Sequence, residues 1–141
     1  MIGSFDTLPF ESASIDAIMS VDAFLFAPDK PAAMAEMARV LRKAGRLVMT
    51  TWDFHSQPAD RPPQVDDHRP LLNVAGFRVV AYDETQDWLG RQSRTTEGLM
   101  EAAEELAIES GEDIATVRKD LEAMRARTAA ILRRVFVVAQ R

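Results

Sequence analysis

The chain has 141 residues, enough for one domain with its own core but short for a complete doubly wound fold. Its net charge of −5, without a basic cluster, argues against nucleic acid or an anionic membrane as the main partner. The lack of cysteine excludes disulfides and thiolate metal sites, and no apolar run reaches the length of a membrane span. We therefore expect a soluble, cytoplasmic protein.

The first predicted elements form a strand, a helix and a second strand. Residues 14–21 (SIDAIMSV) and 46–51 (RLVMTT) are apolar runs typical of strands. Asp29 is the expected N-cap of the helix between them, with Lys43 in its last turn and Gly45 as its stop. Its apolar side chains recur on one face: Met34, Met37, Ala38 and Leu41. Because a whole helix joins the two strands, they must be parallel members of an α/β sheet.

An irregular segment and a short helix come next. Residues 52–63 contain three prolines within six positions and are expected to form a loop over the carboxyl ends of the strands. The short helix covers residues 68–75, begins at a cap formed by Asp66 or Asp67, and stops at Gly76.

A helical insertion is predicted between the last two strands, residues 77–81 and 134–139. Small and apolar residues recur at helical spacing from residue 87 to residue 109, and Gly111 then breaks the pattern. A second helix presents one apolar face: Ile114, Val117, Leu121 and Met124. We expect residues 86–130 to pack over the sheet as a two-helix cap.

Three segments carry a family resemblance: LPFESASIDAIMS, APDKPAAMAEMARVL and KAGRLVMTTW. They resemble the second half of the class I S-adenosylmethionine-dependent methyltransferase domain, in the branch of ubiquinone-biosynthesis and sarcosine or glycine N-methyltransferases. The resemblance implies a partial Rossmann-like α/β sheet, built from the strands that the family numbers 4, 5, 7 and 6, in a single domain over residues 1–141. The last strand of the chain should be antiparallel and lie between its two predecessors.

The elements with which this family binds its cofactor are missing from the sequence. Relatives use a glycine-rich turn followed about 20 residues later by an acidic residue, whereas all six glycines here are isolated. We therefore expect that the N-terminal cofactor-binding half is absent and that the isolated chain binds S-adenosylmethionine weakly. Two functions stay open: methyl transfer to a small molecule as the parent activity, or an inactive truncated remnant that only self-associates or binds a partner.

The resemblance assigns cofactor contacts to Ser4, Phe5, Asp6, Ser20 and Val21. Ser4 stands where relatives often carry an aspartate that binds the adenine amine. The contact then passes to Ser4 itself, to the backbone of Phe5 or to Asp6. Alternatively, residues 4–6 are a frayed terminus without a ligand.

Asp22 is the candidate catalytic residue, because it follows the first strand at the edge where open α/β sheets bind ligands. Its carboxylate is expected to orient or deprotonate the methyl acceptor, or else only to cap the strand end. Further substrate contacts are expected from Trp52, His55, Trp88 and Arg91. Trp88 has packing as its alternative role. Phe26 replaces a histidine of many relatives, which excludes a general base at that position.

Two further expectations concern metals and oligomeric state. His55 and His68 lie near several aspartates, but their separation matches no usual ligand spacing and methyl transfer needs no metal, so we predict no metal site. Without the first three strands of the family, residues 14–21 would form an unprotected apolar edge, which predicts a homodimer.

Overall fold

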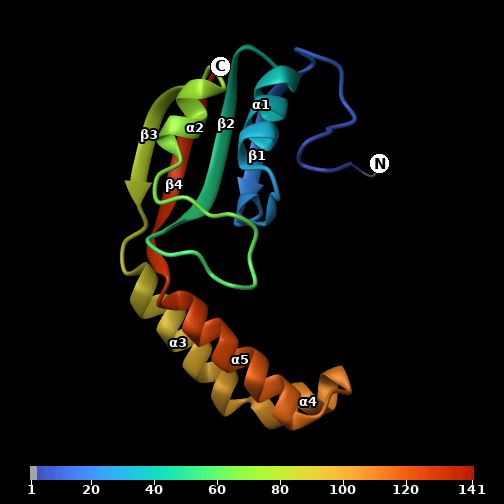
Figure 1. Cartoon of the computed structure of the whole chain (residues 1–141), viewed down its shortest axis with the longest axis vertical. Helices are drawn as coiled ribbons and strands as arrows, with labels where there is room; N and C mark the ends of the chain where they lie inside the picture. The colour runs from blue at the N-terminus through green and yellow to red at the C-terminus, as the bar shows by residue number, and fades with distance from the viewer. Residues whose placement is uncertain (1–2) are drawn as a thin grey trace.

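The computed structural model describes residues 3–141 as a four-stranded mixed sheet with helices on one face and a helical arm at one end (Figure 1). The strands are β1 (Ile15–Val21), β2 (Leu41–Phe54), β3 (Arg78–Glu84) and β4 (Ile131–Gln140), in the order β1-β2-β4-β3. β1 pairs with β2 in parallel, and β4 is antiparallel to both of its neighbours. The predicted α/β class, and the insertion of the last strand between its predecessors, are confirmed.

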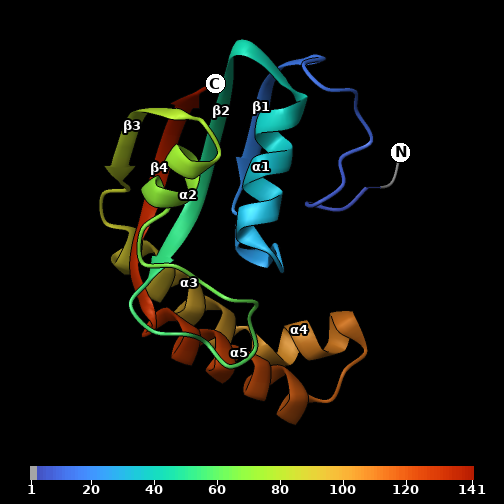
Figure 2. The ribbon, with the colours of Figure 1, turned by 45° about the horizontal axis from the view of Figure 1, so that its top comes forward.

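Two helices cover one face of this sheet, α1 (Lys30–Val40) and α2 (Arg69–Val74) (Figure 2). Asp29 caps α1 as expected, because its carboxylate accepts a hydrogen bond from the Ala32 N–H at 2.9 Å. A short 3-10 helix, η1 (Phe24–Phe26), connects β1 to α1. The core between helices and sheet is built from buried apolar side chains, the largest of them Phe24, Met34, Leu41, Leu47, Met49 and Leu72.

The end of α1 differs from the expectation. The helix stops at Val40, and β2 begins directly at Leu41, so Lys43 and Gly45 lie in the strand. Gly45 is needed there for close packing, since a Cβ atom would lie 2.8 Å from the Arg42 carbonyl oxygen and 3.1 Å from that of Asp16. The glycine therefore marks a close backbone approach between β1 and β2, and not a helix stop.

The helical arm consists of α3 (Trp88–Glu101), α4 (Ala103–Ser110) and α5 (Ile114–Thr128), and it extends from the end of the sheet (Figure 1). The first of the two expected helices is divided at Ala102, which lets Ala103 and Ala107 pack against Val117 and Leu121 in a second, small core. Nowhere in residues 3–141 does a helix combine the length and the apolarity that a membrane crossing requires.

Glu36 and Arg39 of α1 form a clamp that holds the first segment of the chain. Glu36 accepts hydrogen bonds from the Leu8 N–H at 2.8 Å and from Arg39, while Arg39 donates to the carbonyl oxygens of Leu8 and Phe10. The two side chains thus hold the turn that contains Pro9 against the helix. Glu36 and Arg39 therefore have a structural role, because they fix the segment before β1.

Removing the carboxylate of this clamp should weaken the fold in a pH-dependent manner. The hydrogen bonds from Arg39 and from the Leu8 N–H lower the pKa of Glu36 from 4.5 to about 2. Its stabilising contribution is therefore complete above its ordinary pKa and is lost as the pH falls toward 2. We expect Glu36→Gln to cost about 1 kcal/mol at pH 6 in urea unfolding, and almost nothing near pH 2. A difference that stays constant with pH would contradict this, and Glu122→Gln, at an exposed site on α5, is the control.

The face of the sheet opposite α1 and α2 carries apolar side chains without a covering helix among residues 3–141 (Figure 2). The strand register aligns Met19 with Val48, and Thr50 with both Val21 and Phe136. Met19 is 78% exposed and Val21 is 60% exposed. In the described part of the chain, β1 pairs only with β2, so its outer edge is open. We call this surface the bare face.

Candidate functional site

A cavity of about 220 Å³ lies where the sheet, the loop after β2 and the helical arm meet. It opens at the carboxyl ends of β1 and β2, the edge at which α/β sheets usually bind ligands. Its walls come from the strand ends and η1 (Asp22, Leu25, Phe26, Trp52, Phe54 and Ile131), from the loop (Arg61) and from the arm (Gln92, Met124, Arg127 and Thr128). A larger cavity of about 540 Å³ is formed by the arm alone, between α3 and the end of α5. We take the smaller cavity as the candidate site because the strand ends contribute to it.

Asp22 is fixed in this cavity by its backbone and by an arginine. Its φ of 47° places it in the left-handed region, which aspartate tolerates, and this turns the chain from β1 into η1. The Asp22 N–H donates to the Thr50 carbonyl oxygen at 3.0 Å, and Arg134 donates to Asp22 Oδ2 at 2.8 Å. Asp22 Oδ1 is buried without a hydrogen-bond partner among the described residues. An acceptor oxygen in that state costs free energy that a donor from a ligand would recover.

Trp52 forms one wall of the cavity and is held from two sides. The Arg134 guanidinium lies 5.6 Å from the centre of its ring, and Trp88 packs edge-on at 5.7 Å. Trp88 is only 9% exposed, and its indole N–H donates to Glu84 at 3.0 Å. Trp88 therefore supports Trp52 and does not line the cavity itself, which is the alternative role left open by the sequence.

Two other residues expected at the substrate lie elsewhere. His55 is exposed, and its ring Nε2 is 2.8 Å from the Ala129 carbonyl oxygen, so it joins the loop to the end of α5. Arg91 is exposed on α3 and is not among the residues that line the cavity. Gln92, one position further along the helix, faces the cavity instead. Helical periodicity without known neighbours cannot decide between adjacent positions of that kind.

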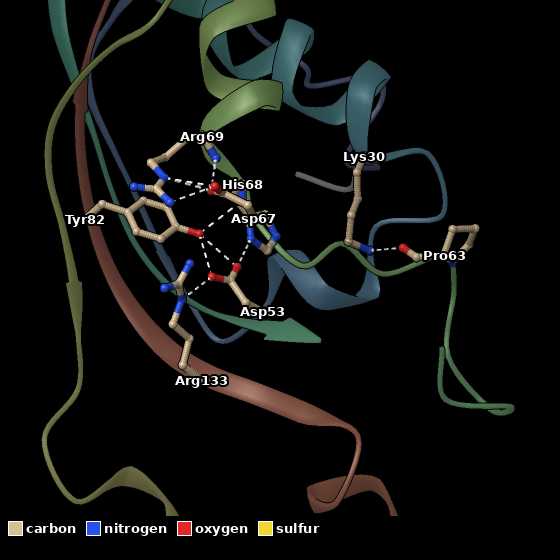
Figure 3. A network of polar contacts seen from close by, with 8 residues as sticks. All are labelled: Lys30, Asp53, Pro63, Asp67, His68, Arg69, Tyr82 and Arg133. Carbon is tan, nitrogen blue, oxygen red and sulfur yellow. Dashed lines mark hydrogen bonds and ion pairs between the residues drawn. The ribbon is translucent and has the colours of Figure 1, made fainter. Parts of the chain in front are cut away.

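A buried polar network ties the loop after β2 to the sheet (Figure 3). Asp53 and His68 are both completely buried, and His68 Nδ1 donates to Asp53 Oδ1 at 2.7 Å. The Tyr82 hydroxyl donates to both carboxylate oxygens, at 2.8 and 2.9 Å, and Arg133 donates to Oδ2 at 2.8 Å. Burial raises the pKa of Tyr82 above its ordinary value, so the hydroxyl stays a donor. The network anchors both ends of the segment from Phe54 to Asp67.

Comparisons with known proteins show similarity to methyltransferases. Residues 1–49 match the methyltransferase domain family. The O-methyltransferase rstn1 of Aspergillus nomiae is 29% identical over 97 residues, which are 59% of this chain and 43% of that protein. The first third of the chain is therefore similar to a methyltransferase domain.

Similar solved structures show how much of their fold this chain covers. The cyclase SpnF matches 100% of the chain and 54% of its own length, with a TM-score of 0.78 and 16% identity. A phosphoethanolamine N-methyltransferase of Haemonchus contortus in complex with S-adenosyl-L-methionine matches 98% of the chain and 36% of its own, with a TM-score of 0.69 and 13% identity. The chain thus spans about half the length, or less, of these proteins.

The region in which the sequence predicts cofactor contacts is only partly enclosed. Gly3, Ser4 and Phe5 help to line an open hollow of about 310 Å³, where Ser4 bonds Asp6 and Phe5 packs edge-on against Phe24 at 6.5 Å. The Ser20 hydroxyl does not extend this hollow, because it is buried without a partner among the described residues. Val21 is exposed at the end of β1. The residues present therefore do not fit the whole cofactor, because the hollow is open and no glycine-rich turn occurs in the sequence.

Several cavity residues were missed from the sequence. The sequence patterns around four of them predict only a strand or a helix: Phe54, Gln92, Met124 and Ile131. These patterns do not show which end of the sheet the helical arm will cover. Arg61 had a stronger signal, since it lies in the proline-rich loop expected at the carboxyl ends. No group of three or more His, Asp or Glu side chains within residues 3–141 is arranged to hold a metal ion.

Proposed function

We propose that this chain is the acceptor-binding part of an S-adenosylmethionine-dependent methyltransferase that acts on a small molecule. The observation that carries the proposal is the cavity at the carboxyl ends of β1 and β2, which combines a fixed carboxylate with aromatic walls and is closed by the helical arm. Ligand sites of this composition usually bind small molecules. Residues 86–130 then act as the cap of a single domain, with the arm as the cover of the acceptor.

The chain's own residues would orient the acceptor and exclude water. The Asp22 carboxylate accepts a hydrogen bond from the hydroxyl or amine that is to be methylated, and Arg134 holds this carboxylate in place. Trp52 supplies a flat apolar wall. Proximity and alignment give most of the acceleration in a direct displacement, so no further catalytic group is required. The cofactor supplies the methyl group when it is bound.

The proposed cofactor contacts of this chain are limited to the hollow at Ser4, Phe5 and Asp6 and to the edge at Ser20 and Val21. Ser20 contributes through its backbone only, since its hydroxyl points into the buried side. We propose that the glycine turn and the ribose-binding acid come from outside these residues. The isolated chain should then be inactive by itself.

A chimera tests the proposed function. In it, this chain replaces the matching segment of the Aspergillus nomiae O-methyltransferase and follows that protein's N-terminal part. We expect labelled methyl groups to pass from S-adenosylmethionine to small molecules of a metabolite extract, and Asp22→Ala to lower the rate about 100-fold. Asp16→Ala, at an exposed site of β1, is the matched control. A chimera that binds the cofactor but labels no small molecule would overturn the proposal.

The bare face favours a second candidate, a chain that only associates. An unprotected parallel edge strand next to exposed apolar residues is a surface that other chains pair with. A second copy of this chain is the simplest partner, because a two-fold axis along the edge makes the contact self-complementary.

A further inference from the structure

We propose that the acceptor is an apolar molecule that carries one carboxylate, and that Arg61 binds this carboxylate. The inference rests on the proposed function, because it takes the cavity for the acceptor site. It starts from the charges that line or border the cavity. Arg127 is paired with Asp60 at 2.6 Å, and Arg134 is paired with Asp22 at 2.8 Å. Arg61 also lines the cavity, but no carboxylate of residues 3–141 lies within ion-pair distance of it.

One positive charge is therefore left uncompensated at the cavity. The negative charge of Asp22 is already balanced by Arg134, so it does not repel an incoming anion at full strength. A guanidinium presents parallel N–H donors that match the two oxygens of a carboxylate. A carboxylate monoanion balances this single charge, whereas a phosphate dianion would leave one negative charge beside Asp22.

Arg61 is held in position before any ligand binds. Its guanidinium carbon lies 4.6 Å from the centre of the Phe26 ring, a cation–π contact that orients the plane of the group. The backbone around it is fixed by Gln57, whose side-chain amide donates to the carbonyl oxygens of residues 58, 61 and 62, and accepts from the Gln64 N–H. A preorganised cation loses little entropy on binding.

Buried groups pin the same loop to η1 and α1. The Gln64 side chain donates to the Leu25 carbonyl oxygen at 2.9 Å, and Lys30 Nζ donates to the Pro63 carbonyl oxygen at 2.6 Å (Figure 3). Burial lowers the pKa of Lys30 to about 8, and the ammonium keeps further contacts with the carbonyl oxygens of Leu25 and Ala27. The loop is therefore a fixed wall of the cavity.

The remaining walls define the rest of the ligand. Six of the eleven lining side chains are apolar or aromatic: Leu25, Phe26, Trp52, Phe54, Met124 and Ile131. The volume of about 220 Å³ is below the roughly 300–1,000 Å³ of sites for drug-sized ligands, so the body is one ring or a short chain. The donor that receives the methyl group lies at Asp22, apart from the carboxylate.

Phenylacetate and phenylacetamide test the inference as a pair of nearly equal size and shape, of which only phenylacetate is an anion. Both are titrated without cofactor into the full chain, and the indole N–H resonance of Trp52 is followed by NMR. We expect phenylacetate to bind about 10-fold more tightly, an advantage of about 1.4 kcal/mol. Arg61→Gln should remove the difference, Arg61→Lys should retain part of it, and Arg118→Gln, at an exposed site far along α5, should leave it intact.

Equal affinities in the wild-type chain, a preference that survives Arg61→Gln, or no shift of the Trp52 signal with either compound would overturn the inference. A melting temperature of Arg61→Gln within about 2 °C of the wild type would show that the substitution leaves the fold intact. Because the titration contains no cofactor, Arg61-dependent binding without methyl transfer in the chimera would refute the proposed function alone. Methyl transfer without carboxylate preference would refute this inference alone.

Discussion

Replacing Asp53 with asparagine is expected to lower the free energy of unfolding by about 3 kcal/mol. The carboxylate is completely buried and accepts from His68, Tyr82 and Arg133. Asparagine keeps the size of the side chain but loses its charge. An NH2 group replaces one carboxylate oxygen, and this donor would face the donors of the network. Arg133 would then be left without its acidic partner in a half-buried place.

Chemical unfolding in urea measures this effect, and the corresponding shift in melting temperature should be roughly 10 °C for a chain of this length. Asp16→Asn is the matched control, because Asp16 pairs with Arg42 on the surface and its side chain is 81% exposed. That variant should change stability by less than about 0.5 kcal/mol. If Asp53→Asn stayed within 1 kcal/mol of the wild type, the network would not be the anchor of the loop.

The second large effect concerns the bare face, where we expect a homodimer. Burial of only ~500 Å² of apolar surface would contribute on the order of 12 kcal/mol before the costs of association. Met19 and Val21 are the exposed apolar residues of the edge strand, and neither lysine nor proline protects them. Light scattering at micromolar concentration should give twice the mass of one chain.

A charged variant of the bare face distinguishes this dimer from other contacts. Met19→Lys should shift the mass toward that of one chain without unfolding it, because the side chain is already 78% exposed. Ile108→Lys on α4 is the control, since Ile108 is 82% exposed at the far end of the helical arm. A wild-type chain that scatters as a stable monomer would show that the bare face is covered in another way.

The sheet could be predicted because each strand carries its own local signal. The helix between β1 and β2 forces these strands to be parallel. The strand order follows from the resemblance of the segments that contain Leu8 and Arg39 to the methyltransferase family. The predicted end of α1 was wrong. Gly45 has the sequence signal of a helix stop, but it lies in β2 and allows the backbone to pack closely against Asp16. The break at Ala102 carries no glycine or proline and could not be read from the sequence.

The candidate site was predicted in part. Asp22 and Trp52 do meet in one cavity, because both follow strands whose carboxyl ends lie at the same edge. His55 and Arg91 lie outside the cavity. The sequence of an irregular loop does not show where its side chains point, and helical periodicity does not show which side of a helix will face a ligand. Asp53 and His68 were weighed only as metal ligands, and their burial in a hydrogen-bonded network depends on contacts with Tyr82 that are remote in sequence.

Isothermal titration of the isolated chain with S-adenosylmethionine tests most directly whether these residues form only the acceptor part of a methyltransferase. The hollow at Ser4 and Phe5 offers one wall, and no glycine turn surrounds the rest of the cofactor. We predict no saturable binding below about 1 mM. A dissociation constant in the low micromolar range would contradict this, because the described residues would then hold the cofactor without the missing elements.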